Sequence, residues 1–156
     1  MKTILATALL LGVSCISANA QSFSFQSTSH TVNSLTAQVS MGKPVLAAFS
    51  SGSSTNTDST GKKSTTTSNC AFWSAEPGSQ FTFVGACNVK ESNGDESSVV
   101  ASCVATNAAQ TEGDCWGGMT GTAGLHKGKT GTISWHQKPS ADNKTGMAWG
   151  VGQWND

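Results

Sequence analysis

The sequence predicts an all-β protein, an antiparallel up-and-down barrel of about eight strands, with a β-sandwich as the alternative architecture. Three observations lead to this class. Short apolar or Thr/Ser-rich runs alternate with clusters of turn-forming residues along the chain. Ser, Thr, Gly and Asn supply most of the polarity, and these residues are poor helix formers. Four cysteines are spread one to a strand through the central part of the chain.

The first twenty residues have the pattern of a secretory signal peptide. Lys2 supplies a positive charge, a short apolar run follows, and Ala18-Asn19-Ala20 forms an A-x-A cleavage site. The apolar run is shorter than the roughly 20 residues of a membrane span, and no later segment is long enough either. We expect secretion or periplasmic export, with residues 21–156 as one domain. A lipoprotein modified at Cys15 is the alternative, although Gly12 stands where such signals usually carry Leu.

The first part of the mature chain gives uneven strand signals. Residues 21–34 alternate Phe with small polar residues, which fits either a strand or a mobile arm. Residues 35–39 alternate with period two and predict a strand, a Gly-Lys-Pro turn follows, and residues 45–50 predict the next strand. Residues 51–69 have low complexity and nothing apolar to bury, so we expect a flexible loop able to carry O-linked sugars or to recognise a partner.

Residues 70–119 predict four consecutive antiparallel strands. Turn-forming clusters at 76–79, 91–95 and 107–113 separate them, because Pro presets φ and Gly accepts positive φ. A glycine-rich stretch at 116–128 comes next. The pattern then predicts strands at 130–137 and 147–154, joined by a turn region at 140–146, with Met147, Trp149 and Val151 on one face of the last strand.

The turn centres predict the disulfide pairing. Residues equidistant from a turn centre lie opposite each other, so the four cysteines form one row across four strands. A disulfide needs Cα atoms within about 7 Å, and only Cys70–Cys87 with Cys103–Cys115 joins neighbouring strands throughout. A zinc site usually has C-x₂₋₄-C spacing, whereas the gaps here are 17, 16 and 12 residues. We therefore expect two disulfides and no metal site.

Composition excludes several functional classes. Without Lys2 the mature chain has eight Lys against nine Asp plus Glu, and it has no Arg. A nucleic-acid-binding protein needs a basic face, so nucleic acid is not an expected partner. No G-x-S-x-G elbow, complete phosphate loop or calcium loop is present, and no cofactor is indicated. The adjacent Asp95 and Glu96 are interpreted as solvated turn residues.

The tryptophans are the best candidates for a ligand site. An indole ring offers an apolar face and one N–H donor, which suits binding of a small apolar or aromatic molecule. The predicted ligand-binding residues are Trp73, Trp116, Trp135 and Trp149. Trp135 and Trp149 lie on facing strands of the last hairpin and are the best pair to line a cavity. Packing in the core is the alternative role for all of them.

Parts of residues 81–154 carry a family resemblance. They include Gly85-Ala86-Cys87, Asn93-Gly94-Asp95 and Gly152-Gln153-Trp154, with spaced glycines between the last two. The chain here resembles small secreted bacterial proteins of unassigned function with the allene oxide cyclase/dirigent type of eight-stranded barrel. The resemblance implies the barrel. It brings no activity, because no residues match the catalytic groups of those enzymes.

Three functional hypotheses follow. The first is an exported, disulfide-linked barrel that binds a small apolar or aromatic ligand. The second is a cyclase- or isomerase-like enzyme, which requires a buried carboxylate or His with a perturbed pKa in the cavity. His136 qualifies only if it points inward, and its alternation with Trp135 argues against that. The third is an envelope or interaction protein that uses the 51–69 segment. The lack of a catalytic constellation favours a binding protein over an enzyme.

Overall fold

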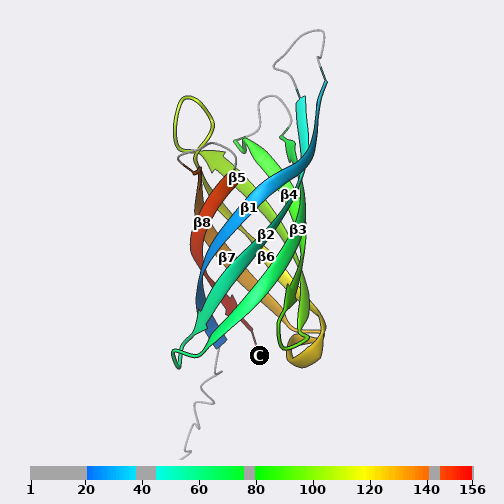
Figure 1. Ribbon diagram of the computed structural model, residues 1–156, viewed down its shortest axis with the longest axis vertical. Coiled ribbons are helices and arrows are strands. Elements are labelled where there is room, and N and C mark those ends of the chain that lie inside the picture. The colour runs from blue at the N-terminus through cyan, green and yellow to red at the C-terminus, as the bar shows by residue number, and fades with distance from the viewer. Residues whose placement is uncertain (1–20, 38–44, 76–79, 141–144, 156) are drawn as a thin grey trace, which may run out of the picture.

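The computed structural model describes residues 21–37, 45–75, 80–140 and 145–155. It confirms the predicted class, because eight antiparallel strands close into one barrel in sequence order, with the last strand paired to the first (Figure 1). The strands are β1 (Gln21–Ala37), β2 (Val45–Asp58), β3 (Lys63–Ser74), β4 (Phe83–Glu91), β5 (Glu96–Ala105), β6 (Gly113–Ala123), β7 (Thr130–Pro139) and β8 (Thr145–Trp154). A single turn of 3₁₀ helix, η1 (Gly124–His126), follows β6.

The first strand is longer than the sequence pattern indicated. It pairs with β8 from Gln21 opposite Trp154 as far as His30 opposite Thr145. Beyond His30, β1 pairs only with β2, and this two-stranded extension projects past one end of the barrel (Figure 1). The predicted turns at residues 42–44 and 76–79 and most of the 140–146 turn lie outside the described residues.

The prediction of a flexible loop at residues 51–69 is wrong. Residues 51–58 and 63–69 form the paired ends of β2 and β3, with a short turn between them. The prediction assumed that a barrel strand must bury apolar side chains, but the inward positions here face a polar interior, where the hydroxyls of Ser54 and Thr66 bond to each other. The turn between the strands is held by Asp58, whose Oδ1 accepts the N–H groups of Thr60 and Lys62 at 2.8 and 3.0 Å. The hydrogen bond from the Thr60 hydroxyl lowers the pKa of Asp58.

Both predicted disulfides are confirmed. Cys70 lies directly opposite Cys87 in the β3–β4 ladder, and Cys103 lies opposite Cys115 in the β5–β6 ladder, with Cα–Cα distances of 4.0 Å. The second bridge is almost fully buried, whereas the first is half-buried in the barrel wall. Period-two alternation sends all four sulfurs to the interior.

The apolar core lies on one side of the barrel interior. Its buried members are Val99, Ala101, Met119 and Trp154. Val99 is opposite Met119, Met119 is opposite Gly131, and Gly131 is opposite Trp154, so three of them lie in one row across four strands. The glycine is needed in this row, because a Cβ there would stand 2.8 Å from the Met119 Cε atom and 3.2 Å from the Trp154 ring.

Candidate functional site

Inward-facing side chains from all eight strands line a cavity of about 160 Å³ inside the barrel. This volume is close to the roughly 150 Å³ of an apolar protein cavity that accommodates benzene. It is smaller than the pockets of about 300–1,000 Å³ that hold drug-sized ligands. The cavity therefore suits a molecule with a single ring or an aliphatic group of similar size.

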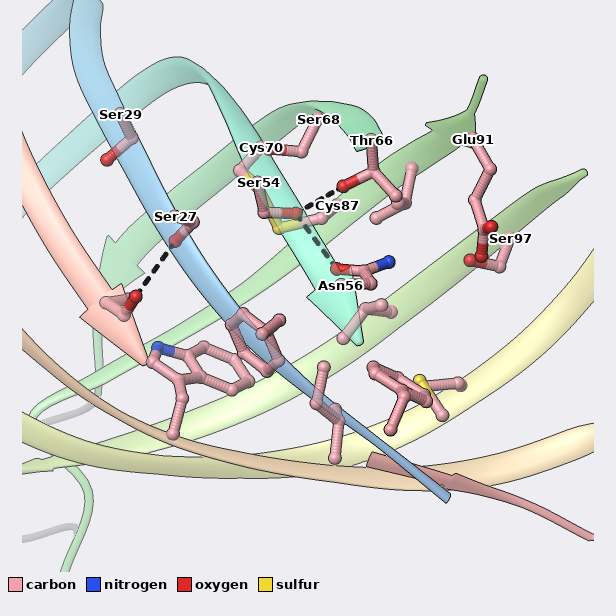
Figure 2. Close-up of a pocket in the computed structure, with 18 of the residues that line it drawn as sticks. Ser27, Ser29, Ser54, Asn56, Thr66, Ser68, Cys70, Cys87, Glu91 and Ser97 are labelled. Atoms are coloured by element: carbon pink, nitrogen blue, oxygen red, sulfur yellow. Dashed lines mark hydrogen bonds between the residues drawn. A yellow bond between two sulfur atoms is a disulfide. The ribbon is translucent and has the colours of Figure 1, made fainter. Parts of the chain in front are cut away.

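The two sides of the cavity differ in chemistry. The strands β1, β2 and β3 contribute small polar groups, most of which Figure 2 labels: Ser27, Ser29, Ser50, Ser54, Asn56, Thr66 and Ser68. The strands β5 to β8 contribute mainly apolar groups: Val99, Met119, Ile133, Trp135, Ala148 and Trp154. Phe23 and Phe25 at the start of β1 complete the apolar lining near the β1–β8 seam. The result is an amphipathic cavity rather than a uniformly apolar one.

Part of the polar wall is free to bind a ligand. The hydroxyl of Ser54 donates to Asn56 Oδ1 at 3.3 Å, and that of Ser27 donates to the Ala148 carbonyl at 3.5 Å. The hydroxyls of Ser29, Ser50 and Ser68 make no side-chain hydrogen bond within the described part of the chain. Each of these hydroxyls can donate or accept, so the wall offers hydrogen bonds of either polarity.

Glu91 is the single ionisable side chain among the described residues that line the cavity. It lies at the end of β4 and lines the cavity together with Ser97 of β5, which is paired with Val89, two residues before Glu91 (Figure 2). Its Oε2 accepts a hydrogen bond from the Ser64 hydroxyl at 3.3 Å. Burial raises the pKa of the Glu91 carboxyl, and the negative charge of Asp95 acts in the same direction. None of the other described lining residues is Lys, Arg or His, and the charge of His126, which does not line the cavity, opposes this rise.

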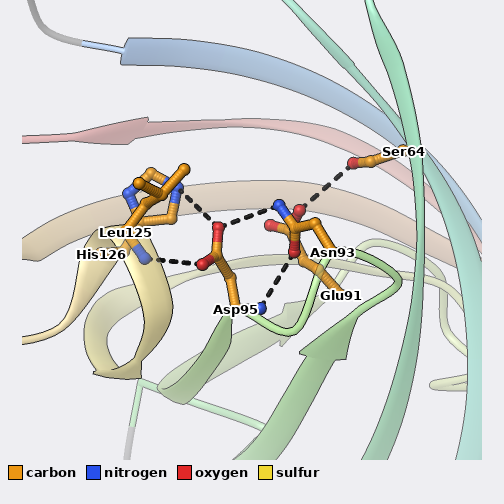
Figure 3. Close-up of polar contacts among 6 residues, drawn as sticks. All are labelled: Ser64, Glu91, Asn93, Asp95, Leu125 and His126. Carbon is orange, nitrogen blue, oxygen red and sulfur yellow. Dashed lines mark hydrogen bonds and ion pairs between the residues drawn. The ribbon is translucent and has the colours of Figure 1, made fainter.

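A buried polar cluster lies beside Glu91, between the β4–β5 turn and η1 (Figure 3). Asp95 is only 5% exposed, so its interpretation as a solvated turn residue is wrong. Its Oδ1 accepts the Leu125 N–H at 2.6 Å, and its Oδ2 accepts from the Asn93 side chain at 3.0 Å. These bonds pin η1 against the barrel. The positive φ of Gly124, +73°, fits the same contact, since a Cβ there would meet the Asp95 carboxylate at 1.8 Å.

His126 joins this cluster to the cavity. Its ring stacks on Trp154, which lines the cavity, with centroids 4.5 Å apart and planes 7° from parallel. Its Nε2 lies 3.9 Å from Asp95 Oδ2, while its buried Nδ1 has no hydrogen-bond partner among the described residues. The histidine thus backs the indole ring of Trp154 and does not itself line the cavity.

Of the four tryptophans predicted to bind a ligand, only Trp135 lines the cavity. Trp73, Trp116 and Trp149 are 41–45% exposed on the outer face. The expected pairing of Trp135 with Trp149 in the cavity is wrong, because Trp149 lies opposite His136, and Trp135 lies opposite Gly150. Adjacent residues of a strand point to opposite sides, so Trp149 must point outward when Gly150 points inward.

The outward position of His136 agrees with the alternation argument. Its Nδ1 lies 2.7 Å from Asp114 Oδ1 on the outer surface, and its ring contacts Trp149. This pair is separated from the cavity by the barrel wall. Of the predicted ligand-binding residues, the cavity contains Trp135 alone; the lining residues left out of that prediction include Glu91 and Trp154. Counting by twos from Cys87 places Glu91 on the inward face, and this signal was available in the sequence.

No group of three or more His, Cys, Asp or Glu side chains in the described residues could hold a metal ion. The described segments also contain no helix with the length and hydropathy needed to cross a membrane. Comparison with family models and with curated proteins gives no match to this chain.

Proposed function

We propose that this protein is an exported binding protein that holds a small, partly apolar ligand inside its barrel. The observation that carries the proposal is the amphipathic cavity, with aromatic rings on one side and free hydroxyls on the other. Binding sites for small molecules are concave and mostly apolar, with a few polar groups that orient the ligand. The volume of about 160 Å³ accommodates a ligand body of about the size of one ring.

Export is part of this proposal. Two disulfides fit an oxidising compartment, in agreement with the signal-peptide pattern of the first twenty residues. The denatured mass of the protein purified from its own host tests this. A mass that matches residues 21–156 less four hydrogens, two for each disulfide, supports export. An uncleaved chain contradicts it, and a lipid on Cys15 would replace free secretion by membrane anchoring.

Benzyl alcohol is a suitable probe for the cavity, because it combines one ring with one hydroxyl. At ten times its Kd, a ligand that binds only the folded state stabilises it by about 1.4 kcal/mol. We expect benzyl alcohol to raise the melting temperature of the mature protein and to bind with a stoichiometry of one by calorimetry.

A matched pair of variants on β3 locates the binding. Ser68 points into the cavity and Thr67 points outward, so Ser68→Leu fills part of the cavity while Thr67→Leu adds the same side chain outside. Ser68→Leu should abolish the shift with benzyl alcohol, and Thr67→Leu should retain it. No shift in the wild-type protein, or an equal shift in both variants, would overturn the proposal.

A second candidate function is a cyclase- or isomerase-like activity with Glu91 as the acid–base group. The requirement set for an enzyme was a carboxylate or His with a perturbed pKa in the cavity, and Glu91 meets it. If Glu91 catalyses an isomerisation, ligand co-purified with wild-type protein and with Glu91→Gln should elute as different isomers of one mass. The same isomer from both proteins would reject this function.

A further inference from the structure

The charge in the cavity is unbalanced. Glu91 brings one carboxylate into the lining, and none of the described lining residues is Lys, Arg or His. The neighbouring Lys90 points outward, where its Nζ pairs with Glu96 at 2.9 Å. A partly buried carboxylate without a cation is unfavourable, so a positively charged ligand group is the natural complement to this site.

The carboxylate also has free acceptor capacity. Its Oε2 accepts one long hydrogen bond, from Ser64 at 3.3 Å, and its Oε1 makes none within the described residues. A carboxylate accepts up to about four hydrogen bonds, and an ammonium group supplies three donors. Ser97 is paired with Val89, two residues before Glu91, and lines the same cavity, so its hydroxyl oxygen is a further acceptor there (Figure 2).

The rest of the lining suits the apolar part of such a ligand. Aromatic residues from β1, β3, β7 and β8 face the cavity: Phe23, Phe25, Phe72, Trp135 and Trp154. The faces of these rings attract cations as well as apolar groups, so the ammonium group of a ligand can pass them on its way to Glu91. From the carboxylate, the rings and the volume, we infer that the ligand is a small amine with a body the size of one ring, its ammonium group bound by Glu91.

The electrostatic surroundings of Glu91 agree with this inference, which rests on the proposed function. Burial raises the pKa of its carboxyl, Asp95 raises it further, and His126 and the Ser64 hydrogen bond lower it. A bound ammonium would lower this pKa again, because it stabilises the ionised form. Near the raised pKa, amine binding should therefore release a proton from Glu91.

Benzylamine and benzyl alcohol have nearly the same size and differ in charge at neutral pH. Comparing them therefore separates binding in the cavity from recognition of an ammonium group by Glu91. Hydrogen bonds to charged groups are worth more than neutral ones, and we expect benzylamine to bind about tenfold more tightly or better at pH 7. Glu91→Gln should remove this preference and change the affinity for benzyl alcohol by less than about threefold. Glu96→Gln is the matched control: it makes the same charge change on the outer face, and it should keep the preference.

Calorimetry in buffers of different ionisation enthalpy gives an independent readout. The wild-type protein should release more protons on binding benzylamine as the pH falls toward the pKa of Glu91, and Glu91→Gln should not. Equal binding of both probes, unchanged by Glu91→Gln, would overturn the amine inference and leave the binding function standing. Binding of neither probe would overturn both.

Discussion

The two disulfides provide a sharp test of what stabilises this barrel. Their loops span 12 and 17 residues, and chain entropy alone assigns each a stabilisation of about 3 kcal/mol, with the Cys70–Cys87 bridge ahead by about 0.3 kcal/mol. Burial makes the Cys103–Cys115 bridge the more stabilising of the two. Cys103 and Cys115 are only 1% and 2% exposed, so replacing both by Ala removes two sulfurs from a packed interior.

The size of the reversal can be estimated. If each sulfur counts as one buried methylene group, its loss costs about 0.8 kcal/mol, so Cys103→Ala/Cys115→Ala should lose about 4.5 kcal/mol in all. Cys70 and Cys87 border the cavity and are half-buried, so each sulfur counts for about half as much, and their double replacement should lose about 4 kcal/mol.

Equilibrium unfolding in urea, extrapolated to zero denaturant, measures both losses. Val100→Ala on the outer face of β5 is the control, and its free energy of unfolding should change by less than about 0.5 kcal/mol. An equal or larger loss for the Cys70–Cys87 variant would refute the reasoning, because loop entropy would then dominate over packing.

Three further predictions follow from the site. The pKa of Glu91 is raised in the folded state, so the native protein still holds a proton that the unfolded chain has released, and the free energy of unfolding falls as the pH rises above about 4.5. Glu91→Gln should therefore gain more stability at pH 7 than at pH 4. An equal gain at both pH values would contradict this. Asp95→Ala should lose about 2–4 kcal/mol, because it leaves the Leu125 N–H and Asn93 without their acceptor; a loss below about 0.5 kcal/mol in urea would reject this role. Gly152→Ala places a Cβ 2.3 Å from the Phe23 ring and should cost about 1–3 kcal/mol, and a double-mutant cycle with Phe23→Leu should recover part of the loss.

The sequence predicted the four-strand centre of the barrel well, for a clear reason. The Pro-Gly and Asn-Gly pairs predict turn centres, and counting outward from such centres gives the pairings of Cys70 with Cys87 and of Cys103 with Cys115 that the structure shows. The β2–β3 hairpin was missed because the reasoning used hydrophobic burial as its signal. In a barrel with a polar cavity wall, inward and outward positions are both Ser or Thr, and the pattern disappears.

The last strand shows a different limit. Met147, Trp149 and Val151 were correctly grouped on one face, but the sequence did not indicate that this face is outside. The structure shows that small residues take the inward positions of β8 from Gly146 to Gly152. A Cβ at Gly152 would meet the Phe23 ring, and one at Gly150 would meet the Ser134 carbonyl and the Trp135 Cβ atom. The alternation of Gly146, Ala148, Gly150 and Gly152 was the available signal.

The topology also has a kinetic consequence. Seven of the eight strand pairings join neighbours in sequence and can form as local hairpins, whereas the β1–β8 pairing joins residues more than a hundred positions apart. Bringing the two ends of so long a segment together has the largest entropic cost of the eight pairings. This cost falls once the local hairpins between them have formed. The seam between Phe23 and Gly152 should therefore form late on the folding path. Since both Phe23 and Trp154 line the cavity, the ligand site is completed only when the seam closes, and a ligand should slow unfolding more than it speeds folding.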